Sequence, residues 1–191
     1  MNGAYRLFKR LSDLLAAAMA LLLLAPLLLL LALLVRLDSP GPVLFRQQRV
    51  GRGGRPFAIL KFRSMVADAE RRGGFATQAG DPRITGVGRW LRRSSLDELP
   101  QLFNVLCGHM SLVGPRPDVP AQQSLYGPRD WQLRCSVRPG ITGLAQASLR
   151  SAATPEQRLA LDLAYVRRQS LALDLQVLAR TAGQVLWRGG N

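Results

Sequence analysis

The feature that most constrains this chain is an uncharged apolar run near its N-terminus, extending from Leu14 to Val35. A helix needs about 20 predominantly apolar residues to cross the hydrocarbon core of a bilayer, and this run is long enough. A secretory signal peptide is the alternative, but the run exceeds the usual apolar length of such peptides and no small-residue cleavage site follows it. The run therefore predicts a membrane segment, which we assign to residues 1–36.

Two features predict that this segment enters the membrane and returns to the side from which it came. Pro26 lies near its middle, where a missing N–H group and a clash with the preceding turn favour a sharp kink. Basic residues flank both ends, and Lys and Arg tend to remain on the cytoplasmic side of a membrane. These flanking residues are Arg6, Lys9, Arg10, Arg36, Arg46, Arg49, Arg52 and Arg55. An ordinary spanning helix also tolerates proline, so the residues alone leave both topologies open.

The charge balance of the chain indicates an anionic partner. Lys and Arg total 26 against 12 Asp and Glu, which gives a net charge of +14 over 191 residues. Nucleic acid, lipid phosphate and phosphorylated small molecules all fit such a charge. We expect no nucleic-acid binding, because the sequence has neither zinc-type Cys/His spacing nor the aromatic pattern of RNA-recognition domains. Cys107 and Cys135 form no CxxC pair, which indicates reduced thiols.

Residues 37–191 predict one mostly α-helical domain with a small antiparallel β-hairpin. The stretches 43–50 and 56–65 have strand character and flank a Gly-Arg-Gly-Gly-Arg turn. Helices are expected at 66–72, at 84–93, from Thr154 to about Gln169, and from Ser170 onward. The last helix is apolar with few charges, so it could pack on the core or lie at the bilayer interface. It also leaves room for a second copy of the chain, as in a homodimer.

Two adjacent carboxylates, Asp97 and Glu98, are the first candidates for chemistry. Ser95 and Glu98 have the S-x-x-E spacing of a capping box, although Pro100 could instead begin the helix with the two acids just before it. The cations nearby in the sequence are Arg89, Arg92 and Arg93. A helix start among cations suits an anion site, whereas an isolated Asp-Glu pair often only caps a helix.

A second candidate is the segment MSLVGPRP at 110–117. Pro115 and Pro117 restrict the backbone on either side of Arg116. A guanidinium held in a stiff loop suits bidentate phosphate recognition. An exposed arginine in a turn is the alternative interpretation, and the spacing alone does not choose between the two.

These segments together resemble the small monotopic phosphoglycosyl transferases of the bacterial sugar transferase family. The matching pieces are Lys9-Arg10 with Asp13, FRQQRVGRGGRPFAILKFRSM (45–65), DPRITGVGRWLRRSSLDELPQLFNVLCG (81–108), MSLVGPRP (110–117), RPGITGLAQ (138–146), Asp162 with Tyr165, and Leu173-Asp174-Leu175. They span nearly the whole chain in the family's order. This chain departs from the family pattern at Ala25, where serine is frequent, and at His109, where an acidic residue is common; we assign His109 no role.

The resemblance implies a transfer in two steps. Asp97 would attack the sugar-bearing phosphorus of a UDP-sugar, release UMP and form an aspartyl phosphosugar, which polyprenyl (undecaprenyl) phosphate would then attack. Glu98 would support Asp97 by hydrogen bonding or by organising Mg²⁺, with Asp97 and Glu98 as the metal-binding pair. The positions implied to bind substrate are Arg92, Arg116, Lys61, Arg63, Asp162 and Asp174. Asp162 and Asp174 could each instead pair with an arginine.

The resemblance also implies a re-entrant helix with both ends in the cytoplasm. The catalytic domain would then lie on the cytoplasmic face of the bacterial inner membrane, where cytosolic nucleotide sugars meet an acceptor phosphate at headgroup level. The product would initiate glycoconjugate or exopolysaccharide assembly, and the motifs do not identify the sugar. The alternative function is a non-catalytic, membrane-anchored scaffold that binds an anion or a nucleotide sugar; the presence of both Asp97 and Glu98 favours the enzyme.

Overall fold

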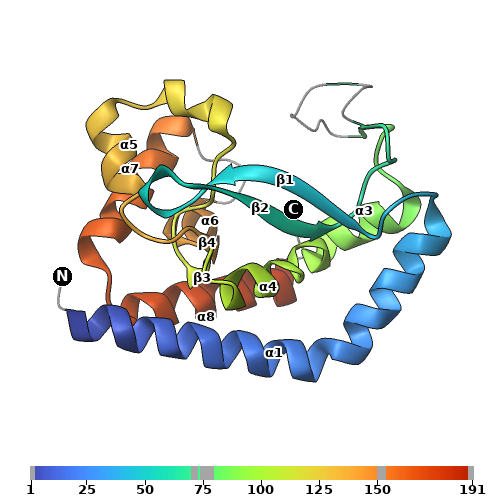
Figure 1. Ribbon diagram of the computed structural model, residues 1–191, viewed down its shortest axis with the longest axis horizontal. Coiled ribbons are helices and arrows are strands. Elements are labelled where there is room, and N and C mark those ends of the chain that lie inside the picture. Colours follow the sequence, from blue (N-terminus) through green and yellow to red (C-terminus); the bar gives the residue numbers. More distant parts are fainter. Residues whose placement is uncertain (1–2, 70–72, 74–79, 150–153, 189–191) are drawn as a thin grey trace.

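A computed structural model of the chain describes residues 3–69, 73, 80–149 and 154–188. Helices dominate it, and a two-stranded antiparallel sheet lies above one long N-terminal helix in the view of Figure 1. The mostly α-helical class with a small antiparallel hairpin is therefore confirmed. The helix expected at 66–72 lies partly outside the described residues.

The N-terminal helix α1 (Gly3–Asp38) contains the predicted membrane segment. Figure 1 shows α1 as two arms that meet at an angle. Pro26 lies inside this helix. Proline lacks an N–H group and displaces the carbonyl one turn earlier, which accounts for a change of direction without an end to the helix.

One face of α1 packs against the rest of the chain, and the opposite face is bare. Ala17, Leu31 and Val35 are buried. The exposed apolar side chains are Leu7, Phe8, Leu11, Leu15, Met19, Leu22, Leu23, Leu29, Leu30, Leu33 and Leu37. A bare apolar face of this length marks an interaction surface. Within the described part of the chain, α1 is the one helix whose length and composition would allow it to cross a membrane.

The predicted hairpin is present. Strands β1 (Leu44–Val50) and β2 (Pro56–Phe62) pair antiparallel along their full length. A short 3₁₀ turn, η1 (Arg52–Gly54), joins them, and Gly53 and Gly54 have φ angles of 69° and 75°. Glycine adopts positive φ without steric cost, so this pair explains how the chain reverses.

The remaining elements follow in chain order. They are α3 (Gly86–Ser94), η2 (Leu96–Glu98), α4 (Gln101–Leu106), β3 (Ser111–Val113), η3 (Pro120–Leu125), α5 (Pro128–Arg134), β4 (Gly140–Thr142), α6 (Leu144–Leu149), α7 (Pro155–Arg168) and α8 (Leu171–Arg188). Strands β3 and β4 form a parallel pair that the sequence did not predict. Strands of three residues are too short to show the alternation that identifies a strand.

Helix starts agree with the sequence at α7 and differ before α4. Thr154 caps α7, as predicted, and its side chain and backbone exchange hydrogen bonds with Gln157. The capping box predicted for Ser95 and Glu98 is wrong, because Ser95 adopts a left-handed conformation with φ of 58° and ends α3. Helix α4 begins only after Pro100. The two acids therefore lie in a separate 3₁₀ turn just before α4, close to the alternative expectation.

Both arms of α1 share a core with the residues that follow. The first arm contributes Ala17 to an apolar cluster with Phe57, Ile59, Leu102, Val105 and Met110. The second arm contributes Leu31 and Val35 to a cluster with Phe62 and Leu91. A third cluster, of Val113, Ala147, Tyr165 and Val177, joins β3 to the C-terminal helices.

Polar contacts attach both ends of α1 to the same domain. Near the start of the helix, the buried Asp13 carboxylate accepts a hydrogen bond from Ser111 Oγ at 2.7 Å and one from Leu112 N at 3.3 Å. Near its end, the buried Arg63 guanidinium donates to three carbonyl oxygens. These belong to Val35, Ser39 and Pro40. Buried charges without partners are costly, so these bonds fix where α1 begins and ends on the domain.

Candidate active site

The two adjacent carboxylates lie in the turn η2, between α3 and α4. The residue Asp97 is 8% exposed, so its side chain borders solvent without projecting into it. Strand β2 lies against η2, and this contact brings Lys61 to the acids. The site is therefore assembled from a strand, a helix end and a turn that are distant in the sequence.

Glu98 is held by two cations. Its Oε1 atom accepts hydrogen bonds from Lys61 Nζ at 2.6 Å and from Arg116 Nη2 at 3.1 Å. Burial alone would raise the pKa of Glu98, but the charges of Arg116 and Lys61 outweigh burial and lower this pKa to about 2. Glu98 is therefore ionised at neutral pH and keeps both cations beside Asp97.

Asp97 is in a different state from its neighbour. Within the described residues, no hydrogen bond or ion pair reaches its carboxylate. Burial raises the pKa of Asp97; Lys61 opposes this rise most strongly, and Glu98 adds to it. A carboxylate with unengaged lone pairs among cations is suited to attack phosphorus, because the cations attract an anionic substrate while the oxygen stays available.

Helix α3 supplies a further cation, Arg92. Its Nε atom donates a hydrogen bond to Ser64 Oγ at 2.8 Å. The charge of Arg92 also acts on Asp97 and opposes the rise that burial causes in the pKa of that carboxyl. Lys61, Arg92 and Arg116, three of the residues predicted to bind substrate, thus gather around the carboxylate pair.

Behind Arg116 lies a buried ion network that the sequence did not reveal. Arg134 contacts Asp118 at 2.6 Å and Asp162 at 2.9 Å. Its Nη2 atom also donates to the carbonyl oxygen of Arg116. Burial raises the pKa of Asp162 to about 6, although Arg134 opposes the rise. Arg134 therefore binds the backbone of the Pro-Arg-Pro loop at Arg116, whereas Glu98 binds the Arg116 side chain.

Arg49 is a second residue that the sequence analysis missed. Its Nη1 atom donates to the carbonyl oxygen of Pro117 at 3.0 Å, which steadies the same loop. In the hairpin, Phe45 pairs with Lys61, and Arg49 lies four residues further along β1. Alternate residues of a strand share a face, so this period could have indicated that Arg49 and Lys61 point the same way. Arg134 has no comparable signal.

Three of the predicted substrate-binding residues lie outside the cluster. Arg63 donates to carbonyl oxygens at the end of α1. Asp162 pairs with Arg134, the alternative that its sequence context left open. Asp174 contacts Lys9 Nζ at 2.8 Å and accepts a hydrogen bond from Tyr165 at 2.7 Å. Each side chain thus has an internal partner, and contact with substrate stays a prediction for all three.

The carboxylate pair has a donor set that fits magnesium. Mg²⁺ prefers oxygen ligands and commonly takes one or two carboxylates, with water and substrate phosphate completing its shell. The Asp97 oxygens are unengaged, and Glu98 receives both of its cations on Oε1. No cluster of three or more His, Cys, Asp or Glu side chains in the described ranges could hold a metal. A metal ion here would therefore complete its shell with oxygen atoms from water and the substrate.

Known proteins resemble this chain over most of its length. The family described as Bacterial sugar transferase matches residues 4–188. A Caulobacter vibrioides protein named UDP-glucose:undecaprenyl-phosphate glucose-1-phosphate transferase is 48% identical over 190 residues, which are 96% of this chain and 71% of that protein. An Escherichia coli (strain K12) protein of the same name is 47% identical over 175 residues, 87% of this chain but only 38% of its own length.

A relative of similar size also exists. The exopolysaccharide production protein PSS of Rhizobium leguminosarum bv. phaseoli is 45% identical over 192 residues, covering 95% of this chain and 96% of that protein. The family match includes α1, the hairpin, the η2 turn with its two carboxylates, and the C-terminal helices. The chain therefore belongs to the bacterial sugar transferase family.

Proposed function

We propose that this chain transfers a sugar 1-phosphate from a UDP-sugar to undecaprenyl phosphate and releases UMP. The observation that carries the proposal is the unengaged Asp97 carboxylate among Lys61, Arg92 and Arg116. The names of the relatives support the substrate class. One relative is named for UDP-glucose and another for UDP-N-acetylgalactosamine, so the sugar stays open.

In the first step, an Asp97 oxygen donates a lone pair to the sugar-bearing phosphorus of the UDP-sugar. A P–O bond to Asp97 forms while the bond from this phosphorus to the bridging oxygen breaks, and UMP leaves with the electron pair. The carboxylate and the diphosphate repel each other, so the approach needs the cations Lys61, Arg92 and Arg116. The product of this step is an aspartyl phosphosugar.

In the second step, a phosphate oxygen of undecaprenyl phosphate attacks the same phosphorus. The bond from phosphorus to Asp97 breaks, and its electron pair returns to the carboxylate, which restores the enzyme. A covalent intermediate divides one difficult displacement between two anions into two easier ones. The lipid acceptor then needs to reach the site only after UMP has been formed.

The surrounding residues hold this arrangement in place. Glu98 keeps Lys61 and Arg116 beside Asp97, and Arg134 holds the Arg116 carbonyl so that the guanidinium stays directed at Glu98. Mg²⁺, when bound by Asp97 and Glu98 with the substrate, would offset the negative charge of the diphosphate.

We also propose that α1 enters the cytoplasmic face of the inner membrane and returns to it. Asp13, near the start of α1, and Arg63, which binds its end, attach both ends to one domain. A straight helix across the bilayer would carry its ends to opposite sides and break one of these attachments. The bend of α1 (Figure 1) lets its bare apolar face lie in lipid while both ends stay with the domain.

Replacing Asp97 with asparagine tests the proposed reaction. An amide of nearly the same shape is not a nucleophile, so UMP release from UDP-sugars, with undecaprenyl phosphate and Mg²⁺ present, should fall about a thousandfold or more. Asp130→Asn, in the first turn of α5, makes the same chemical change outside the cluster and should keep wild-type turnover. UMP release by Asp97→Asn at the wild-type rate would contradict the mechanism. Absence of turnover in the unchanged protein with every sugar offered would favour the scaffold.

The pH dependence of kcat/KM should depend on Lys61. Asp97 attacks as the ionised carboxylate, so kcat/KM falls as the pH drops through the raised pKa of Asp97. Lys61→Gln removes the cation that most strongly lowers this pKa, and the acid limb of the profile should therefore move to higher pH. Lys61→Arg keeps the charge and should leave the limb near its wild-type position, whatever its maximal rate. An unmoved acid limb in Lys61→Gln would show that Lys61 does not act on Asp97.

Cysteine labelling in cells tests the proposed topology. Gly3 and Arg55 are exposed, at the start of α1 and in the hairpin turn, and each can be replaced by cysteine after the exposed Cys107 is changed to serine. A membrane-impermeant maleimide supplied from the periplasm should label neither position, and both should react once the inner membrane is opened. Periplasmic labelling at position 3 alone would mean that α1 crosses the membrane.

A further inference from the structure

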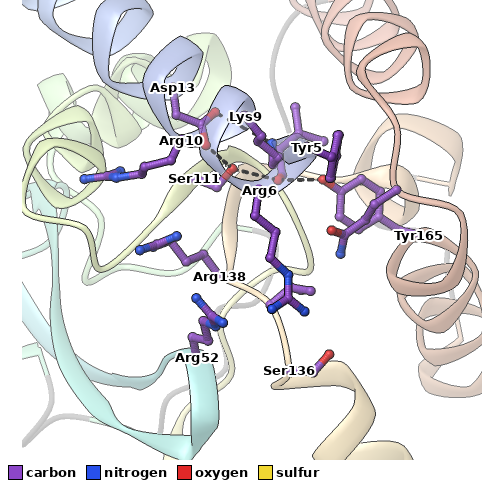
Figure 2. A pocket seen from close by; sticks show the side chains of 13 residues that line it. Tyr5, Arg6, Lys9, Arg10, Asp13, Arg52, Ser111, Ser136, Arg138 and Tyr165 are labelled. Atoms are coloured by element: carbon purple, nitrogen blue, oxygen red, sulfur yellow. Dashed lines mark hydrogen bonds and ion pairs between the residues drawn. The ribbon is translucent and has the colours of Figure 1, made fainter. Parts of the chain in front are cut away.

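A second cationic site lies at the start of α1. A cavity of about 50 Å³ opens there, lined by α1, η1, β3 and the segment between α5 and β4. Figure 2 shows Arg6, Arg52 and Arg138 around this hollow. These arginines come from three segments that are far apart in the sequence, so the fold itself brings the charges together.

This cavity is separate from the candidate active site. None of the residues that line it belongs to the cluster around Asp97. Arg10, which does line it, donates to the carbonyl oxygens of Val105 at 2.8 Å and Leu106 at 3.2 Å, at the end of α4. Asp97 precedes the start of α4, and six helical residues span about 9 Å.

The cavity carries more positive charge than its own acid can neutralise. Its cations are Arg6, Lys9, Arg10, Arg52 and Arg138, and its carboxylate is Asp13. Asp13 already accepts hydrogen bonds from Ser111 and Leu112, and Lys9 pairs with Asp174 at 2.8 Å. The excess charge therefore belongs to the arginines.

The arginines have neutral partners or none. Arg138 donates to the carbonyl oxygen of Gly108 at 2.9 Å, and Arg10 donates to the two carbonyl groups at the end of α4. For Arg6 and Arg52, no acceptor is found in the described part of the chain. Burial, followed by the charges of Arg10 and Arg52, lowers the pKa of Arg138. Positive charges that line one cavity repel one another, and an anion between them relieves this repulsion.

A neutral donor in the same cavity also lacks an acceptor. The Nε2 atom of Gln169 is buried, and the described residues offer it no hydrogen-bond partner. Buried donors are satisfied in the great majority of native structures. Together with the arginines, this amide indicates that an oxygen-rich ligand belongs in the cavity.

The surface beside the cavity is apolar. Leu7, Leu11 and Leu15 follow Arg6 and Arg10 along α1 and are 63%, 50% and 66% exposed. These leucines belong to the bare face of the first arm of α1. A ligand whose phosphate lay among the arginines could therefore extend hydrocarbon along this arm.

We infer that the cavity binds the phosphate group of an anionic phospholipid, whose acyl chains lie against the exposed leucines of the first arm of α1. Charge-assisted hydrogen bonds between guanidinium and phosphate are roughly twice as strong as neutral ones and are often bidentate. The bound phosphate relieves the repulsion among the arginines and links α1, η1 and the segment before β4. The lipid is not consumed, and its effect is to hold the start of α1 on the domain.

Lipid binding to the full-length protein tests this inference. The protein is placed in phosphatidylcholine nanodiscs that contain a minor share of phosphatidylglycerol, and the retained phosphatidylglycerol is counted by native mass spectrometry. Arg6→Gln/Arg52→Gln should weaken retention about thirtyfold, since each basic residue near an anionic lipid contributes about 1 kcal/mol and every 1.4 kcal/mol is about a factor of ten. The control, Arg55→Gln/Arg129→Gln, removes the same net charge from exposed positions outside the cavity and should retain the lipid.

The outcomes separate lipid from soluble phosphate. Equal retention by the two double variants would overturn the inference. Thermal protection by inorganic phosphate or glycerol phosphate that matches the lipid and is lost in Arg6→Gln/Arg52→Gln would overturn the lipid assignment and leave a site for soluble phosphate. If the double variant fails to fold, Arg52→Gln alone should still reduce retention, and wild-type retention in that variant would count against the site. UMP release plays no part in this readout, so the proposed reaction can fail independently.

Discussion

The ion cluster in which Glu98 accepts hydrogen bonds from both Lys61 and Arg116 is the interaction on which the site depends. It makes two neighbouring carboxylates unlike each other. Glu98 binds the two cations, and their charges lower its pKa to about 2. Burial raises the pKa of Asp97, and the oxygens of Asp97 stay unengaged. The cations are thus already in place when an anionic substrate arrives, and no rearrangement is needed to neutralise it. In the proposed reaction, one acid positions the cations and the other attacks phosphorus.

The cluster in turn depends on the ion pairs of Arg134 and on the apolar packing of α1. Arg134 lies between Asp118 and Asp162 and holds the Arg116 carbonyl, so a residue that never meets the carboxylate pair fixes one of its cations. Helix α1 contributes to the core beneath β2 and α4 with its first arm and to the core beneath α3 with its second. Helix α1 is therefore part of the framework that positions the site and not a detachable anchor. In the proposed topology, the same packing would place the domain at the bilayer surface.

The sequence predicted those features that depend on local chemistry. The Gly-Gly turn indicated the hairpin and Thr154 indicated the start of α7, both of which the structure contains. The Asp97–Glu98 pair with Arg92 and Arg116 predicted an anion site; the structure brings these residues together, and anion binding stays a prediction. The failures have both local and long-range causes. Ser95 has the spacing of a capping residue, but α4 begins only after Pro100, and Ser95 ends α3 instead. Arg134 became recognisable only when folding placed it between two acids, and the β3–β4 pair is too short for a periodic signal.

The most direct measurement of the central claim is the mass of the protein during turnover. The full chain is mixed with a UDP-sugar that supports turnover and with Mg²⁺, without lipid acceptor, then quenched rapidly and digested for peptide mass spectrometry. A covalent mechanism requires the mass of one sugar phosphate on the peptide that contains Asp97, and loss of that mass once undecaprenyl phosphate is added. Formation of glycolipid at the normal rate with no added mass on Asp97 at any time would contradict the account.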